Sequence, residues 1–497
     1  MAVLLAVLLA MSFFTGIAVT LAHARGLPDE APAARAYLDA MQAAIQAMRQ
    51  DRQTIADAAM VAADHYVAGG PLGVEGGAGL DMLLANRPGG LADYFGQAGK
   101  QITGEPHAVV LYAIGPYAGR LDPRQAAKAD LDHIASMKAA GATVSVIASK
   151  AMLQQLGLLD DALAMAPNLI DTHAHADAAA SDAPIHSVMT QVAAWAWQAE
   201  LVAACTRAGR SPVLNVAADH RAAAARQRRM LGQRFHVDRQ PEPIAPGALA
   251  DAWLSDLGKQ FTDVGTASWI PLASTAHRAA DTIRQGGVAW LHVTPGPVAN
   301  RTSGQLQHDP QSLAVWTAGD MAGPDRDDLL LVVGETQRAN GLAWNNLAAM
   351  QQAGWIVWCL NAVDARPNDI GQHQTLLDQR GSAGDAVTSM PGYDVKFGPT
   401  SDILREAIVW MISVQTRADL QRNPNDWQQW HERKDRAPGH LQRPNNPRLP
   451  GNPRDDDQQD KPGVWGSKFN VAGDLPPRGL RSGDGSRPFA AARESSS

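Results

Sequence analysis

The stretch VVLYAIGPYAGRLDPRQAAKADLDHIASMKAAGATVSVIAS, residues 109–149, decides the fold class of this chain. It begins with an apolar run typical of a β-strand, continues with a helical pattern that ends at Gly141, and closes with a second β-type run at 143–149. A strand, a helix and a strand at this spacing favour a right-handed crossover between parallel strands. The sequence therefore predicts an α/β fold with a parallel sheet.

The residues on either side extend this pattern. Residues 33–67 have apolar positions at three- and four-residue spacing and predict one or two amphipathic helices. A short strand, PLGVEGG at 71–77, follows, and Leu169-Ile170 adds another strand. Residues 183–209 form a long helical pattern that is apolar on most sides, which indicates a buried helix. Together these segments predict one domain over 33–217.

The same landmarks recur in the same order about 215 residues later, which is the signature of a repeated unit of ordinary domain size. The matching pairs are Gly69-Gly70 with Gly286-Gly287, Gly115 with Gly334, Gly141 with Gly354, and Pro184 with Pro399. We therefore expect two tandem, doubly wound, flavodoxin-like domains at 33–217 and 250–420, joined by a linker at 218–249.

Composition excludes several classes of protein. The chain has 497 residues, 45% of them hydrophobic, which is enough for two or three domains with their own cores. A formal net charge of −7 argues against a dedicated nucleic-acid binder. The two cysteines, Cys205 and Cys359, lie in apolar runs, so we expect them to be buried rather than to form a disulfide framework or a zinc site.

The two ends differ from the body of the chain. Residues 1–24 are apolar, lack a basic start and end in Ala22-His23-Ala24, which predicts a signal peptide, with a membrane anchor as the alternative. The predicted location is therefore the periplasm or cell envelope. Residues 421–497 are rich in Pro, Asn and Asp and show no apolar periodicity, so we expect a disordered tail whose partner the sequence does not identify.

The ordered set of segments resembles the sugar isomerase (SIS) domain, and its repetition is similar to double-SIS proteins such as the isomerase half of glucosamine-phosphate synthases. The resemblance covers roughly 35–217 and 250–420 and is carried by 62–77, 182–209, 279–296, 327–362 and 398–415. It implies five-stranded parallel sheets flanked by helices and a phosphosugar bound beyond the strand ends. A homo-oligomer is a separate expectation. No cofactor is expected.

The resemblance places the ligand in turns of the second domain, where helix N-termini and small hydroxyls favour a phosphate. In the first domain the matching turn, residues 115–118, carries Tyr117 and has no small hydroxyl, so the second domain is the better candidate. The expected ligand-binding residues are Thr294, Gly296, Thr302, Ser303, Gly334, Thr336, Gln337, Arg338, Thr400 and Ser401.

Aldose–ketose isomerisation needs a carboxylate or an imidazole that moves a proton between adjacent carbons. Glu335, Glu75 and His186 are the candidates, because each falls near the expected ligand end of a sheet. The alternative for each residue is a structural role. Glu75 would be a solvated acidic residue in the turn after a strand, and His186 would cap or pack the first turn of the long helix.

The segment LIDTHAHAD, residues 169–177, supports a competing hypothesis. Alternation along a strand would place His173 and His175 on one side, with Asp171 or Asp177 in support, as in metal-dependent amidohydrolases. That family forms a (β/α)₈ barrel, and the repeat accounts for more of this chain. A third alternative is an exported binding or structural protein without catalytic activity.

Overall fold

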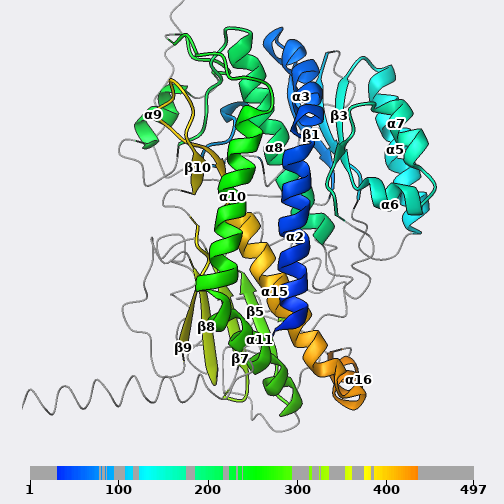
Figure 1. The fold of residues 1–497 in the computed structure, drawn as a ribbon, viewed down its shortest axis with the longest axis vertical. Coiled ribbons are helices and arrows are strands. Elements are labelled where there is room, and N and C mark those ends of the chain that lie inside the picture. Colours follow the sequence, from blue (N-terminus) through cyan, green and yellow to red (C-terminus); the bar gives the residue numbers. More distant parts are fainter. Residues whose placement is uncertain are drawn as a thin grey trace, which may run out of the picture. The chain divides into compact units, whose positions relative to one another are not determined.

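The computed structural model describes the following residues: 31–77, 80, 84, 87–94, 107–115, 122–174, 185–216, 223–230, 233–237, 239–293, 313–315, 324, 326–334, 353–360, 374–381 and 385–434. All of them belong to one compact unit of the chain. They form a mixed α/β structure with two parallel sheets (Figure 1).

The first sheet has the strand order β1-β2-β3-β4, and all three pairings are parallel. Helix α5 (Pro123–Ala139) connects β2 to β3, which confirms the predicted crossover. Asp122 caps this helix by accepting a hydrogen bond from the Arg124 N–H at 2.9 Å. The strands are β1 (Leu72–Gly76), β2 (Val109–Ala113), β3 (Thr143–Ala148) and β4 (Ile170–Asp171).

The second sheet has five parallel strands in the order β6-β5-β7-β8-β9. From β5 the chain moves outward to β6, and then it returns past β5 to form β7, β8 and β9 on the other side. The strand order therefore reverses between β5 and β7. In the first sheet, the described strands follow one another across the sheet in chain order, without such a reversal. The strands are β5 (Ala289–Val293), β6 (Ala314–Val315), β7 (Leu329–Val333), β8 (Trp355–Leu360) and β9 (Gln374–Asp378).

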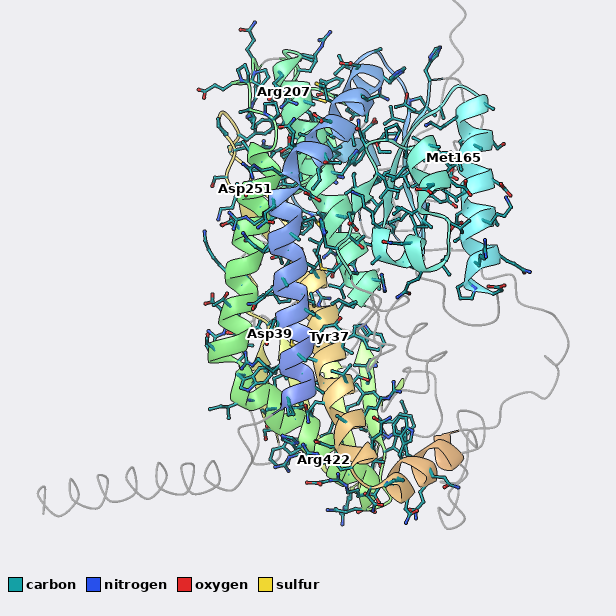
Figure 2. All side chains as sticks on the ribbon, turned by 45° about the vertical axis from the view of Figure 1, so that its right-hand side comes forward. Tyr37, Asp39, Met165, Arg207, Asp251 and Arg422 are labelled. Atoms are coloured by element: carbon teal, nitrogen blue, oxygen red, sulfur yellow. The ribbon has the colours of Figure 1, made fainter. Side chains whose placement is uncertain are left out.

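Six helices connect the two sheets in a reciprocal arrangement. They are α2 (Pro32–Gln50), α3 (Arg52–Val67), α8 (Ile185–Arg207), α10 (Ala248–Ala267), α11 (Trp269–Arg284) and α15 (Ser401–Gln421). Helix α3 packs on α8 and the first sheet, and α11 packs on α15 and the second. Helix α2, from the first half of the chain, packs against α15 from the second half. Helix α10, from the second half, packs against α8 from the first half (Figure 1). Helix α2 buries Tyr37 and exposes Asp39 (Figure 2).

Gly70 and Gly287 are required for the same structural reason. A Cβ atom added to Gly70 would lie 2.2 Å from the His107 carbonyl oxygen, and one added to Gly287 would lie 2.0 Å from the Asp327 carbonyl oxygen. Both contacts involve the backbone just before the strand that pairs with the one following the glycine, β2 for Gly70 and β7 for Gly287. Only glycine allows so close an approach.

The remaining described elements are short. They are the 3₁₀ turn η1 (Ala92–Tyr94), α6 (Lys150–Gln155), α7 (Leu159–Met165), α9 (Ala223–Met230), β10 (Ala386–Thr388), β11 (Phe397–Pro399) and α16 (Pro424–Lys434). Strands β10 and β11 pair antiparallel, with Ala386 opposite Pro399.

Helix α16 corrects the predicted extent of the disordered tail. The expectation of disorder from residue 421 is wrong for 424–434, which form a helix packed on α15 and α11. Trp430 is buried, and Asp426 accepts a hydrogen bond from Arg284 at 3.1 Å. These tertiary contacts order a segment that lacks its own apolar periodicity. Residues 435–497 lie outside the described residues.

The cysteines and the N-terminus can be compared with the remaining predictions. Cys205 and Cys359 are both free and fully buried, as expected. Residues 1–24, the predicted signal segment, lie outside the described residues. Within the part of the chain that the structure describes, no helix has the length and hydropathy needed to cross a membrane.

Candidate functional site

The reversal of strand order in the second sheet defines the candidate site. Val293 at the end of β5 and Val333 at the end of β7 are register partners, so the chain leaves both strands at the same edge. In open α/β sheets, ligands bind outside the carboxyl ends of the strands at such a reversal. Two predicted ligand residues, Thr294 and Gly334, directly follow these strands, and Thr294 lies outside the described residues.

Gly334 is fixed by contacts with the next two strands. Its N–H donates to the Cys359 carbonyl oxygen at 3.2 Å. The Gln379 side chain, fully buried, donates from Nε2 to the Gly334 carbonyl oxygen at 3.0 Å and to the Cys359 carbonyl oxygen at 2.7 Å. The Gln379 side chain, which lies just after β9, therefore connects the ends of β7 and β8 by hydrogen bonds. These hydrogen bonds connect the strand ends next to the reversal of strand order.

The predicted ligand residues at the start of α15 have an internal partner. The backbone N–H groups of Thr400 and Ser401 donate to Asp385 Oδ1 at 3.1 and 2.8 Å. Thr400 is fully buried and Ser401 nearly so. A carboxylate of the chain thus occupies the place at which helix N-termini commonly bind anions.

A buried ion-pair network surrounds this helix start. Arg87 lies 3.2 Å from Asp385 Oδ2 and 2.6 Å from Asp402 Oδ2. Arg405 lies 3.1 Å from Asp402 Oδ1 and donates to Ser401 Oγ at 3.2 Å. Among the described residues, the network contains two positive and two negative side chains. Arg87 comes from the first half of the sequence, so both halves contribute to this region.

The Cys359 thiol beside this network is not an activated nucleophile. Burial raises the pKa of Cys359 to about 12, although its hydrogen bond with Gln379 and the positive charge of Arg405 act in the opposite direction. The thiol therefore remains protonated at neutral pH, and thiolate is the reactive form.

Glu75, a predicted catalytic residue, lies on the first sheet within β1 rather than after it. It is in register with Tyr112 of β2. Its Oε2 lies 3.0 Å from His133 Nε2 on α5, and the Tyr112 hydroxyl donates to Asp130 on the same helix at 2.7 Å. Burial and these acidic neighbours raise the pKa of Tyr112. The structure thus places Glu75 in a polar contact between β1 and α5.

His186 lies in the first turn of α8, as predicted. Its carbonyl oxygen accepts a hydrogen bond from Thr190 Oγ1 at 2.6 Å. Burial lowers the pKa of His186, so its imidazole is neutral at pH 7 and has a nitrogen that can accept a proton. The other predicted site residues lie outside the described residues: Gly296, Thr302, Ser303, Glu335, Thr336, Gln337, Arg338 and His175.

The prediction that His173 lies on a strand is wrong. Strand β4 ends at Asp171, and His173 has a φ of 51°, in the left-handed region. Its N–H donates to Asp171 Oδ1 at 3.0 Å, which is the local turn that Asp side chains favour. Its Nε2 lies 3.0 Å from Asp51 Oδ2, at the junction between α2 and α3.

Arg380 holds the same position in the second half. It has a φ of 59°, its N–H donates to Asp378 Oδ1 at 3.0 Å, and its Nε donates to Ser268 Oγ at 3.1 Å, at the junction between α10 and α11. Both His173 and Arg380 therefore connect a strand end to a helix junction. Among the described residues there is no group of three or more His, Cys, Asp or Glu side chains that could hold a metal ion.

The site residues that sequence reasoning missed are Arg87, Gln379 and Asp385. Arg87 lies in the loop-like sequence NRPGG, and Gln379 follows a five-residue strand with little apolar character. Asp385 precedes a short hairpin that the sequence did not predict. None of these residues lies in a motif, because each acts through contacts with distant parts of the chain.

Comparisons with known proteins give only remote similarities. No family model matches, and no curated protein matches. Solved structures that are similar include a provisionally assigned phosphosugar isomerase from Silicibacter pomeroyi DSS-3, with 11% identity over 79% of this chain and 99% of that one and a TM-score of 0.40. Tagatose-6-phosphate ketose/aldose isomerase from Escherichia coli has 11% identity over 79% of this chain and 91% of its own, with a TM-score of 0.38. These similarities do not establish a family.

Proposed function

We propose that this chain binds a sugar phosphate or a related carbohydrate derivative at the carboxyl edge of the second sheet, between β5 and β7. The observation that carries the proposal is the reversal of strand order at this point, where Val293 and Val333 end side by side. The SIS-like sequence pattern separately predicts ligand contacts in the turns that follow these two strands and at the start of α15.

The chemistry of the edge supports a polar ligand. Gly334 is held by the Gln379 amide, so the turn that follows it starts from a fixed point. The hydroxyl of Thr336 and the backbone N–H groups of this turn are the proposed donors to a phosphate. Proton transfer between adjacent carbons, if the ligand is isomerised, falls to Glu335 or to the neutral imidazole of His186.

We also propose that the two halves are copies of one unit and that only the second has kept the ligand site. Both halves have the close glycine contacts of Gly70 and Gly287, and both have the turn seen at His173 and Arg380. The described strands of the first sheet lack the reversal of strand order at which ligands commonly bind.

Binding is tested by following the Tm of the purified chain with aldose and ketose phosphates and with the unphosphorylated sugars. The Thr336→Ala variant is the test of the turn, and Thr266→Ala, on an exposed part of α10, is the matched control. The proposal expects phosphosugars to raise the Tm of the wild type and of the control, with a smaller rise for Thr336→Ala. Absence of any rise would contradict it.

Catalysis needs a separate experiment. Incubation of each bound phosphosugar with the protein in D₂O, followed by proton NMR, detects conversion between aldose and ketose together with deuterium at the carbon that exchanges. Conversion that is lost in His186→Gln or Glu335→Gln identifies an isomerase. Binding without conversion or exchange identifies a binding protein.

A further inference from the structure

We propose that Asp385 is a specificity-determining residue that keeps phosphate away from the start of α15. The inference rests on the proposed function and refines it. The anionic group of the ligand is then confined to the ends of β5 and β7, and the part of the ligand that reaches α15 is uncharged.

The backbone holds the Asp385 carboxylate in place. Strands β10 and β11 pair antiparallel with Ala386 opposite Pro399, so the residue before β10 and the residue after β11 are brought together. These are Asp385 and Thr400. Asp385 has a φ of 69°, a left-handed conformation that Asp tolerates better than most residues. The hairpin therefore presents the carboxylate to the first turn of α15.

The carboxylate uses the same donors that a phosphate would need. One oxygen, Oδ1, accepts hydrogen bonds from two of the N–H groups at the helix start, those of Thr400 and Ser401. The other oxygen, Oδ2, lies 3.2 Å from the Arg87 guanidinium. A helix N-terminus and an adjacent arginine are a common setting for an anion, and here the anion belongs to the chain.

Among the described residues, the arginines at this helix start already have anionic partners. Arg87 and Arg405 are each paired with Asp402, and Arg87 is also paired with Asp385. The side chains of Arg87 and Asp402 are both 9% exposed, so solvent screens them little. A phosphate placed here would meet two carboxylates in a region of low dielectric, which is unfavourable.

The test is to remove the carboxylate and to ask whether phosphate takes its place. Asp385→Gly is the informative variant, because it removes the carboxylate and glycine suits the positive φ. Asp385→Asn is the matched control, since it changes the charge by the same amount and keeps an oxygen that can accept the two N–H groups. Both are heated in inorganic phosphate and in chloride of equal ionic strength.

The proposal expects phosphate to raise the Tm of Asp385→Gly by roughly 2 °C or more at phosphate concentrations about ten times its Kd. The wild type and Asp385→Asn should show a smaller rise than Asp385→Gly. If Asp385→Gly is unfolded in chloride, recovery of its helical circular dichroism in phosphate alone gives the same answer. An equal response of Asp385→Gly and Asp385→Asn, or no response of Asp385→Gly, would overturn the proposal.

These outcomes are separate from those of the proposed function. Titration of the wild type with phosphosugars tests the site at β5 and β7, whereas the phosphate response of Asp385→Gly tests the start of α15. A wild type that binds no phosphosugar would refute the proposed function even if Asp385→Gly gained a phosphate site. A wild type that binds phosphosugar while Asp385→Gly gains nothing would refute the role of Asp385 alone.

Discussion

Glu200 on α8 and Gln415 on α15 lie 215 residues apart in sequence, and each accepts hydrogen bonds from the first turn of a helix in the other half of the chain. Glu200 on α8 accepts hydrogen bonds from the N–H groups of Gly247 and Ala250 at 2.8 and 2.9 Å, at the start of α10. Gln415 on α15 accepts one from the Ala33 N–H at 3.0 Å, at the start of α2. Both side chains are fully buried. The two halves are therefore joined by a pair of reciprocal helix caps.

Removal of the Glu200 cap should weaken the fold. Glu200→Ala leaves buried N–H groups without an acceptor, so we expect a loss of about 1–3 kcal/mol in the free energy of unfolding. Glu200→Gln should cost less, because an amide oxygen performs this task at Gln415. Urea denaturation of the two variants checks the difference. Equal losses in Glu200→Ala and Glu200→Gln would show that capping is not the role of this side chain.

The pKa of Glu200 predicts how the free energy of unfolding changes with pH. Burial raises the pKa of Glu200, although its backbone hydrogen bonds and Arg207 act in the opposite direction. The folded state therefore holds this proton to a higher pH than the unfolded state, and stability falls as pH rises between the two pKa values. Relative to the wild type, Glu200→Gln should gain stability as pH rises from about 4 towards neutrality. A pH-independent difference in the midpoint of urea denaturation would contradict this.

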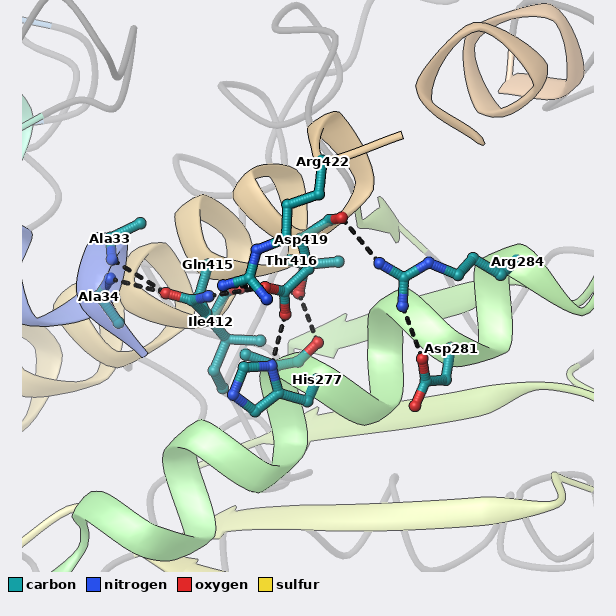
Figure 3. Close-up of polar contacts among 11 residues, drawn as sticks. Ala33, Ala34, His277, Asp281, Arg284, Ile412, Gln415, Thr416, Asp419 and Arg422 are labelled. Atoms are coloured by element: carbon teal, nitrogen blue, oxygen red, sulfur yellow. Dashed lines mark hydrogen bonds and ion pairs between the residues drawn. The ribbon is translucent and has the colours of Figure 1, made fainter. Parts of the chain in front are cut away.

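The Asp419 carboxylate links Gln415 to α11. It accepts hydrogen bonds from His277 Nδ1 and, at 2.9 Å, from Gln415 Nε2 (Figure 3). Asp419→Ala leaves both donors without this acceptor, and we expect a loss of about 2–4 kcal/mol. His277→Ala should cost less, because Asp419 keeps its bond with Gln415. The matched control is Asp281→Ala, an exposed partner of Arg284, with an expected change below about 1 kcal/mol. A loss for Asp281→Ala as large as that for Asp419→Ala would contradict this ranking.

A second pair of residues with the same sequence separation meets between α8 and α15. Gln191 and Glu406, which are 215 residues apart like Glu200 and Gln415, hydrogen-bond each other in the core, and Glu406 also accepts from Ser187 Oγ at 2.7 Å. Gln191→Glu would place two carboxylates in contact, so one must hold a proton. We expect a loss of about 3 kcal/mol or more at neutral pH, which becomes smaller in acid.

The exchange variant tests whether the two positions are equivalent. The double variant Gln191→Glu/Glu406→Gln restores one amide and one carboxylate, and it should recover more than half of the stability lost in Gln191→Glu. Thermal and urea denaturation at two pH values measure both effects. A double variant no more stable than Gln191→Glu would contradict the equivalence of these positions.

The Gln379 amide is expected to support the site at β5 and β7. Gln379→Ala removes two buried hydrogen bonds to the ends of β7 and β8, and we expect a loss of about 1–3 kcal/mol. The same change should raise the Kd for a phosphosugar, because the turn after Gly334 loses its fixed start. Gln50→Ala, at an exposed glutamine at the end of α2, is the control for both measurements. An unchanged Kd would remove Gln379 from the account of the site.

The sequence predicted the main elements of the fold for physical reasons that are local. The apolar runs at 109–115 and 143–149 became β2 and β3, and the pattern at 183–209 became α8. Strand β9 was not predicted, because QTLLD has few apolar residues and gains its stability from pairing with β8. Helix α16 was missed for the same reason, since its order comes from contacts with α15 and α11.

The site was harder to predict than the fold. The strand ends at Val293 and Val333 follow from the pattern, and so does the start of α15 at Thr400 and Ser401. The partners of that helix start do not, because Arg87 and Asp385 lie about 300 residues apart in sequence and meet only through tertiary structure. Alternation along the sequence predicts a strand at His173, but the Asp171 side chain forms a turn there instead. Export through residues 1–24 stays a prediction.

The most direct test of the central claim is the affinity of the purified protein for aldose and ketose phosphates, measured by isothermal titration calorimetry with Thr336→Ala and Thr266→Ala in parallel. The account predicts that a phosphosugar binds the wild type and Thr266→Ala equally well, and binds Thr336→Ala with a Kd about tenfold higher or more, as expected for the loss of a hydrogen bond to a charged group. If no phosphosugar binds the wild type, or if Thr336→Ala binds as tightly as Thr266→Ala, the proposed site between β5 and β7 is wrong.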